Sequence, residues 1–153
     1  MPSDIRQLHE ALIDLAVLMN RPQRDDVLIK EAGIALDRAL FPLLVRIERR
    51  GPIGVVELAD GAGRDHTTVS RQVAKLESLG LVARRPNPAD RRIHEAVVTD
   101  KGRAMTDALD AARARLAGPI LARWSEQDLN DLTRLLRRFA DDLTGRSAGA
   151  EPS

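Results

Sequence analysis

Residues 65–80 decide the fold, and they read DHTTVSRQVAKLESLG. Apolar residues recur here at spacings of three and four positions, which gives a helix one apolar stripe of Val69, Val73, Leu76 and Leu79. At about 100° per residue, the opposite face holds short, polar or basic residues: Thr67, Arg71, Ala74 and Ser78, flanked by Ser70 and Lys75. Asp65 suits the N-cap, and Gly80 suits a left-handed stop. An amphipathic helix with a bare basic face is therefore predicted.

A β-hairpin is predicted directly after this helix. Residues 81–85 have the composition of a strand, residues 86–90 read PNPAD and form a turn, and residues 95–98 return as a second strand. Arg91 and Arg92 follow the turn. A helix with a basic face followed by a hairpin with arginines at its tip is the pattern of a winged helix-turn-helix, which predicts binding to double-stranded DNA.

The residues before Asp65 complete that motif. Ile53 is predicted to add a short strand, and residues 55–60 a short helix with its apolar side chains inward. Residues 61–63 read GAG and form the turn. A short helix, a glycine turn and a longer amphipathic helix make a helix-turn-helix.

Further helices are predicted on both sides of the motif. On the N-terminal side they cover residues 5–19, 23–32 and 37–49, and Pro42 in the third predicts either a kink or a late helix start.

On the C-terminal side, Thr99 is predicted to cap a long helix that Pro119 bends. Ser125 is predicted to cap a final helix that Gly145 ends.

The first and last helices carry apolar seams with alternating steps of three and four residues. The seam residues that we assign to a dimer interface are Leu8, Leu12 and Leu15, with Leu129, Leu132, Leu136 and Phe139. Such seams outside the central motif favour packing on a second copy, and closure of one monomeric bundle is the alternative.

The predicted fold class is thus mostly α with a small β-hairpin wing (α+β), a winged helix-turn-helix with N- and C-terminal dimerisation helices. Residues 1–34 and 104–145 are assigned to dimerisation, 35–103 to the DNA-binding domain and 146–153 to a disordered tail.

Composition supports this class of protein. The chain has 153 residues and a net charge of only +1, but residues 64–103 hold nine basic and five acidic side chains. Positive charge is therefore concentrated around the motif. The absence of cysteine excludes disulfides, thiolate metal sites and thiol redox sensing, and 2% aromatic residues argue against stacking on single strands. No segment resembles a secretory signal or a membrane span, so we expect a cytoplasmic protein without a membrane partner.

Catalytic and metal sites are not predicted. The sequence lacks a nucleophile elbow, a phosphate loop and a zinc-protease motif, and its adjacent aspartate pairs diverge on helices. His9, His66 and His94 stand alone, so no metal and no cofactor are expected. The remaining alternative is a winged-helix module that binds proteins and senses no ligand.

Several blocks of the sequence resemble the MarR family of bacterial transcriptional regulators. Their order and spacing match over residues 53–103, and the flanking helices match in kind. The blocks are VELAD at 56–60, residues 65–75, LESLGLV at 76–82, DRR at 90–92 and VTDKG at 98–102.

This resemblance implies a homodimer with interlocked terminal helices and two winged domains in successive major grooves. It also implies release of DNA by a small anionic or phenolic (aromatic) ligand bound between the winged and dimer domains. Members that sense peroxide use a cysteine, which this chain lacks. Pro42 and the break at Arg21-Pro22 depart from the family pattern and put the shape of the usual ligand cavity in question.

The expected DNA contacts on the helix follow from its exposed face. Arg71 can pair with O6 and N7 of a guanine, and Lys75 with a phosphate. The helix N-terminus offers further donors to phosphate, from His66, Thr67, Thr68 and Ser70. Helix capping and a solvated face are the alternative for the serine and threonines, and His66 alone can be a plain surface residue.

In the hairpin, Arg92 is expected to enter a minor groove with Asp90 orienting it, and Arg91 to lie beside it. The alternative is that Asp90 and Arg92 only stabilise the turn. Arg84 and Arg85 must point to opposite faces of the strand, so at most one faces DNA, and Arg84 is assigned to the DNA-binding set.

Overall fold

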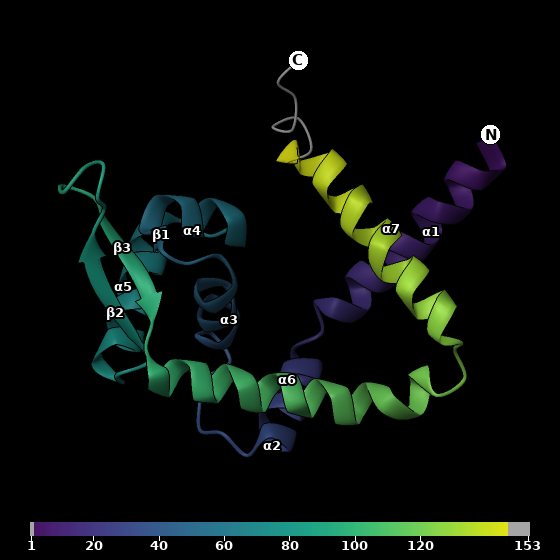
Figure 1. The fold of residues 1–153 in the computed structure, drawn as a ribbon, viewed down its shortest axis with the longest axis horizontal. Coiled ribbons are helices and arrows are strands. Elements are labelled where there is room, and N and C mark those ends of the chain that lie inside the picture. Colours follow the sequence, from purple (N-terminus) through teal and green to yellow (C-terminus); the bar gives the residue numbers. More distant parts are fainter. Residues whose placement is uncertain (1, 147–153) are drawn as a thin grey trace. The chain divides into compact units, whose positions relative to one another are not determined.

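The computed structural model describes residues 2–146, which form seven helices and a three-stranded sheet (Figure 1). The elements are α1 (Pro2–Met19), α2 (Pro22–Ala32), α3 (Phe41–Arg50), β1 (Ile53–Gly54), α4 (Val55–Ala62), α5 (His66–Ser78), β2 (Val82–Pro86), β3 (His94–Val98), α6 (Asp100–Leu121) and α7 (Glu126–Thr144). The chain divides into two compact units between Arg113 and Ala114, inside α6. The predicted α+β winged helix-turn-helix fold is confirmed. The predicted tail lies, apart from Arg146, outside the described residues.

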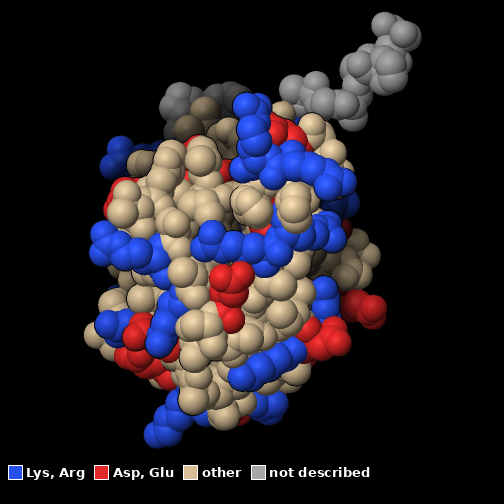
Figure 2. Space-filling model, turned by 90° about the vertical axis from the view of Figure 1, so that its left-hand side faces the viewer, with Lys and Arg blue, Asp and Glu red and all other residues tan. Residues whose placement is uncertain are grey.

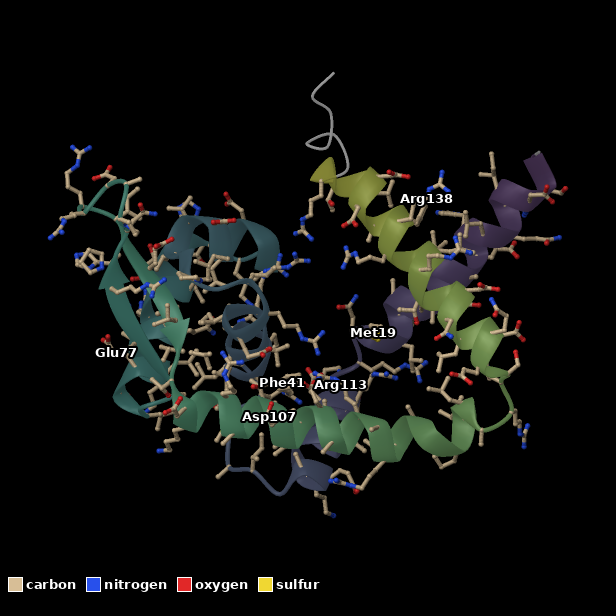
Figure 3. All side chains as sticks on the ribbon, in the orientation of Figure 1. Met19, Phe41, Glu77, Asp107, Arg113 and Arg138 are labelled. Carbon is tan, nitrogen blue, oxygen red and sulfur yellow. The ribbon has the colours of Figure 1, made fainter. Side chains whose placement is uncertain are left out.

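One apolar core holds the first unit together. Its fully buried side chains come from α3, α4, α5, β2 and α6: Leu43, Leu44, Leu58, Val69, Val73, Leu76, Val82 and Leu109. Removing such a side chain from water stabilises the fold by about 1.5–3 kcal/mol. Phe41 of α3 and Arg113 of α6 point toward one another, with the guanidinium 5.8 Å from the ring centroid (Figure 3).

Pro42 produces a late helix start. The alternative of a kink is wrong, because residues 38–40 form a turn and α3 begins at Phe41, which places Pro42 in its first turn. A proline costs no hydrogen bond there, since the first N–H groups of a helix have no partner within it.

The helix-turn-helix forms as the sequence predicts. Gly63 adopts a left-handed conformation with φ 65° at the end of α4. Asp65 caps α5 by accepting a hydrogen bond from the backbone N–H of Thr68 at 2.9 Å. Gly80 has φ 76°, and the next N–H, that of Leu81, donates back to the carbonyl of Leu76 at 3.0 Å. The turn and both ends of α5 are thus set by local chemistry.

The sheet has the order β1-β3-β2, with both pairs antiparallel. Ile53 lies opposite Ala96, which confirms the short strand that its position predicted. Arg84 also lies opposite Ala96, and Arg85 opposite Glu95. The strands of the hairpin begin within one residue of their predicted limits. The wing, which we define as β2, β3 and the turn between them, is therefore a hairpin tied to the core by β1.

The start of α6 is bonded to the end of α5. The Thr99 hydroxyl donates to the carbonyl of Gly80 at 2.6 Å, the Thr99 N–H to that of Leu81 at 3.1 Å, and Lys101 Nζ to that of Leu79 at 2.9 Å. Thr99 Oγ1 also accepts from the N–H of Gly102 at 3.1 Å, which confirms it as a cap. These bonds satisfy the carbonyls of residues 79–81, which follow directly after α5.

The other helices also follow the sequence at their ends. Gly33 and Gly145 close α2 and α7 in left-handed conformations, and Ser125 caps α7 by accepting from the N–H of Asp128 at 3.0 Å. Pro119 lies two residues before the end of α6, so its missing N–H affects only the last turns of that helix.

We expect Gly102→Ala to lower the free energy of unfolding by about 1–3 kcal/mol. Gly102 is buried, and a Cβ there would collide with the carbonyl oxygen of Leu81. Gly118 of the same helix has nothing within 4 Å of its Cβ position. Gly118→Ala should therefore be neutral or stabilising by up to about 1 kcal/mol. Urea unfolding followed by circular dichroism, at one protein concentration, measures both. Equal losses from the two variants would contradict the close approach of α6 to Leu81.

Candidate nucleic-acid interface

Helix α5 has one buried face and one open face. Val69, Val73 and Leu76 are 0% exposed, whereas Thr67, Arg71 and Lys75 are exposed. Neither the Arg71 nor the Lys75 side chain forms a hydrogen bond or an ion pair within residues 2–146. Two cations held on a packed helix without a protein partner are available to an external anion.

The N-terminus of α5 is arranged around Asp65. Thr68 donates to its carboxylate through both the backbone N–H and the hydroxyl, the latter at 2.5 Å. These hydrogen bonds hold the pKa of Asp65 below its usual value. The Thr68 hydroxyl is therefore engaged in the cap, which favours the capping alternative for this residue. His66 Nε2 lies 3.3 Å from Asp60 Oδ1, so the imidazole connects α4 to α5.

The wing turn is built by two side chains. Asn87 Oδ1 accepts from the N–H groups of Ala89 and Asp90, at 2.7 and 3.1 Å. Asp90 then accepts from Arg92 three times, from the backbone N–H and from Nε at 3.1 Å and from Nη2 at 3.2 Å. This ion pair lowers the pKa of Asp90 and raises that of Arg92. The Arg92 side chain is nevertheless 91% exposed, so its guanidinium is held in one direction while facing solvent, and Arg91 beside it is also exposed.

The two arginines of β2 face opposite ways, as the alternation of a strand requires. Arg85 is exposed. Arg84 is half-buried, and its Nη2 lies 3.4 Å from the carbonyl oxygen of Ser70 on α5. Its Nε is buried and has no partner within the described residues. Arg84 therefore braces the wing against α5, and Ser70 is half-buried next to it.

Sequence reasoning missed one pair of polar residues. Arg64 Nη1 donates to Oε1 of Gln72 at 3.0 Å and to the carbonyl oxygen of Ala39 at 2.9 Å. In sequence, Arg64 counted only as one of the basic residues around the motif, and Gln72 had no assigned role. No spacing rule could have found the pair, because the turn before α3 completes it.

Basic side chains are numerous on the face of the molecule that carries the wing (Figure 2). Figure 2 views the molecule from the side that carries the wing, and Lys and Arg side chains are spread over that face with fewer Asp and Glu between them. This agrees with the excess of basic residues in 64–103. The electrostatic field of the face favours a polyanion.

A cleft of about 580 Å³ is lined by residues of α2, of the turn before α3 and by Arg64. Its charged lining consists of Asp25, Asp26, Asp37, Arg38 and Arg64, and Arg38 is paired with Asp26 at 3.2 Å. Burial and the nearby Asp26 raise the pKa of Asp25. None of the lining residues comes from α6.

The seam residues of the terminal helices are largely open to solvent. No residue of α7 is buried, and on α1 none of the residues whose side chains are described is buried. Among the predicted dimerisation residues, Leu8, Leu15, Leu132 and Leu136 are 37–49% exposed, and Leu12, Leu129 and Phe139 are half-buried. None of the helices in residues 2–146 combines the length and hydropathy needed to cross a membrane. Within the same residues, no three His, Asp or Glu side chains are grouped as metal ligands would be.

Known proteins resemble this chain in sequence. The MarR family model matches residues 36–94. The uncharacterized HTH-type transcriptional regulator YxaD of Bacillus subtilis is 33% identical over 104 residues, which are 68% of this chain and 73% of that protein. The regulator YdgJ of the same organism, also an uncharacterized HTH-type protein, is 27% identical over 118 residues, 77% of this chain and 72% of its own.

Solved structures share the fold. A MarR family protein from Bacillus stearothermophilus superposes with a TM-score of 0.72 at 21% identity, covering 94% of this chain and 98% of its own. The transcriptional regulator BldR of Sulfolobus solfataricus superposes with a TM-score of 0.60 at 25% identity, covering 90% and 99%. YxaD, YdgJ and BldR are named as transcriptional regulators, and this protein is a transcriptional regulator as well. With its open basic helix and its wing, the chain belongs to the MarR family of DNA-binding, winged helix-turn-helix transcriptional regulators.

Proposed function

We propose that this regulator is a repressor that binds an inverted-repeat operator as a homodimer and leaves it when a small ligand binds. The observation that carries the proposal is the pair of unpartnered cations, Arg71 and Lys75, on the open face of a helix whose other face is buried. A dimer that fills two major grooves of a promoter excludes other proteins from that DNA, which is why we propose repression. Residues 35–103 read DNA in this proposal, and residues 1–34 and 104–145 form the dimer.

Within each winged domain, α5 enters the major groove. Arg71 reads a guanine, because its planar fork matches the O6 and N7 acceptors. Lys75 contacts a phosphate as a point charge. The exposed Thr67 and the N-terminal backbone N–H groups of α5 approach phosphate, where the helix dipole attracts it. Thr68 and Arg84 support α5 from within the domain, since the Thr68 hydroxyl is bonded to Asp65 and Arg84 to the backbone carbonyl of Ser70.

Selection of bound duplexes from random DNA, at a stated salt concentration, tests the function itself. The recovered sequences should be inverted repeats with half-sites about one helical turn apart. Arg71→Ala should cost about 1–3 kcal/mol and relax the choice of one base pair per half-site. Lys75→Ala, the matched control on the same face, should weaken specific and random DNA alike and flatten the salt dependence. If Arg71→Ala behaved like Lys75→Ala, Arg71 would be a phosphate contact.

The wing extends the contact beyond the half-site. Asp90 directs an exposed Arg92, and a narrow A·T-rich minor groove concentrates the negative potential that such an arginine meets. The two prolines of the turn, Pro86 and Pro88, limit the conformations that are lost when the tip is ordered on DNA.

Arg92→Lys keeps the charge and loses the fork that Asp90 holds. We expect this variant to bind random DNA normally but to lose the preference for A·T over G·C in the flanks of the operator. Asp90→Ala should show a milder version, because it removes only the orientation. Titration of one operator with either type of flank provides the measurement. If the wild-type protein bound operators with either type of flank equally well, the Asp90–Arg92 ion pair would serve only to stabilise the turn.

The dimer is proposed from the open apolar faces of α1 and α7. Seven large apolar side chains on α1 alone are 40–62% exposed, including Ile5, Val17 and Met19. Monomeric proteins rarely leave contiguous apolar areas of this kind in water. A second copy of the same chain covers them, as is typical of MarR-family regulators.

Sedimentation at micromolar concentration should give twice the chain mass of 16.8 kDa. Leu132→Asp or Leu136→Asp should dissociate or unfold the dimer, because each change buries an unpaired charge in the seam. Asn130→Asp is the matched control, since this exposed residue lies on the opposite face of α7. A wild-type monomer, or an equal effect of Asn130→Asp, would contradict this interface.

Ligand control rests on the family and on the cleft beside α2. The cleft carries three carboxylates against two arginines, and a small aromatic acid bound in it pairs with Arg38 in place of Asp26.

A thermal-shift screen of phenolic and aromatic acids should yield a compound that raises the unfolding temperature and weakens DNA binding. Asp25→Asn should strengthen the binding of such an acid if it occupies the cleft, because one carboxylate is neutralised. A stabilising acid whose affinity is unchanged by Asp25→Asn binds elsewhere. Absence of any compound with both effects argues against ligand control.

A further inference from the structure

Arg64 connects three parts of the winged domain. It lies in the turn between α4 and α5, and its Nη1 contacts both the carbonyl oxygen of Ala39, in the turn before α3, and Oε1 of Gln72 in the middle of α5. Both distances, 2.9 and 3.0 Å, are those of good hydrogen bonds. Because the contact with Gln72 is partly buried, it is screened less than a pair in open water.

This contact determines which way the Gln72 amide faces. A guanidinium can only donate, so the amide atom next to Arg64 has to be the oxygen. The amide nitrogen, Nε2, then points away with two N–H groups. Within residues 2–146 these two N–H groups meet no acceptor. Gln72 thus presents donors to a partner, while its oxygen is already engaged.

The surroundings of Gln72 favour an anion. A hollow of about 230 Å³ beside it is lined by Arg71 and Lys75 of α5 and by residues 37, 39 and 40. One carboxylate, that of Asp37, also lines the hollow, and its Oδ1 already accepts from the N–H of Ala39 at 2.7 Å. The hollow is therefore lined by two cations and an amide donor but by only one carboxylate, and one oxygen of that carboxylate is already hydrogen-bonded.

The acceptor is better placed on the DNA backbone than on a base. A glutamine reads adenine through its oxygen and nitrogen together, and here the oxygen is not available. Gln72 also lies about 100° around the helix from Arg71, on the flank that faces the turn before α3. The flank of a helix in a major groove faces the phosphates that border the groove.

We propose that Gln72 donates through Nε2 to a phosphate oxygen of the DNA backbone, and that Arg64 is the positioning residue that turns its amide for this contact. The proposal rests on the proposed insertion of α5 into the major groove. It adds a contact that fixes the register of α5, made by a residue pair joined across the turn before α3.

The test pairs protein variants with modified DNA. Methylphosphonate groups replace single phosphates, one position at a time, in a duplex recovered by the selection described above. Replacement of the phosphate that Gln72 contacts should weaken binding of the wild-type protein by about tenfold, as expected for a hydrogen bond to a charged group. Gln72→Met should weaken binding to the unmodified duplex by a similar factor and show no further loss at that one phosphate.

Two further variants separate the contact from a purely structural role. Gln72→Glu keeps an acceptor for Arg64, and so keeps the fold, but replaces the donor by a negative charge. It should bind unmodified DNA poorly and recover on the duplex with the methylphosphonate at the same position, because the repulsion there is gone. Arg64→Met should lose about as much affinity as Gln72→Met, and the double variant no more than either.

The outcomes are distinct from failure of the proposed function. If no duplex is recovered, DNA reading by α5 itself is wrong. If DNA is bound but the loss from Gln72→Met is equal on every modified duplex, the phosphate contact is overturned. Additive losses from Arg64→Met and Gln72→Met, with both variants folded by circular dichroism, would overturn the positioning role of Arg64.

Discussion

Burial of one face of α5 is the constraint on which the rest of the structure depends. Val69, Val73 and Leu76 are withdrawn completely from water, at about 1.5–3 kcal/mol each, and this fixes the rotation of the helix about its own axis. With the rotation fixed, Arg71 and Lys75 must point outward. A helix that reads a groove needs one fixed buried face and one fixed exposed face. If it could rotate about its axis, it would present a different set of side chains to the DNA at each encounter.

Polar contacts then hold α5 along its length. Asp65 accepts from the N–H of Thr68 at its start, Thr99 and Lys101 donate to carbonyls of residues 79–81 just after its end, and Arg64 donates to Gln72 in its middle. Each contact is modest by itself, at about 0.5–1.5 kcal/mol. Together they order the helix before DNA arrives, so less conformational entropy is lost on binding.

The first and last helices, α1 and α7, differ from the winged domain in the exposure of their apolar side chains. The winged domain holds most of the buried apolar residues, whereas α1 has no buried residue among its described side chains and α7 has none at all, and both expose large apolar side chains. Apolar faces of this kind gain stability when a partner covers them. In the dimer proposed above, that partner is a second copy of the same chain.

Sequence alone determined the local elements and the fold class. Periodicity, caps and glycine stops placed α4, α5, the wing and the start of α6, because these depend on interactions within a few residues. The spacing of Asp90 and Arg92 likewise predicted their pairing. Two alternatives around Pro42 stayed open in sequence, and only the packing of Phe41 and Leu40 into the core selected the late helix start.

Tertiary structure decided the contacts between distant segments. Sequence alternation showed that Arg84 and Arg85 face opposite ways, but only the folded chain places Arg84 on the backbone of α5. The Arg64 contact to Ala39 joins residues 25 positions apart, and its contact to Gln72 spans a turn. Such pairs leave no periodic pattern, since a side chain that satisfies a distant carbonyl obeys the geometry of the fold and not the spacing of its own helix.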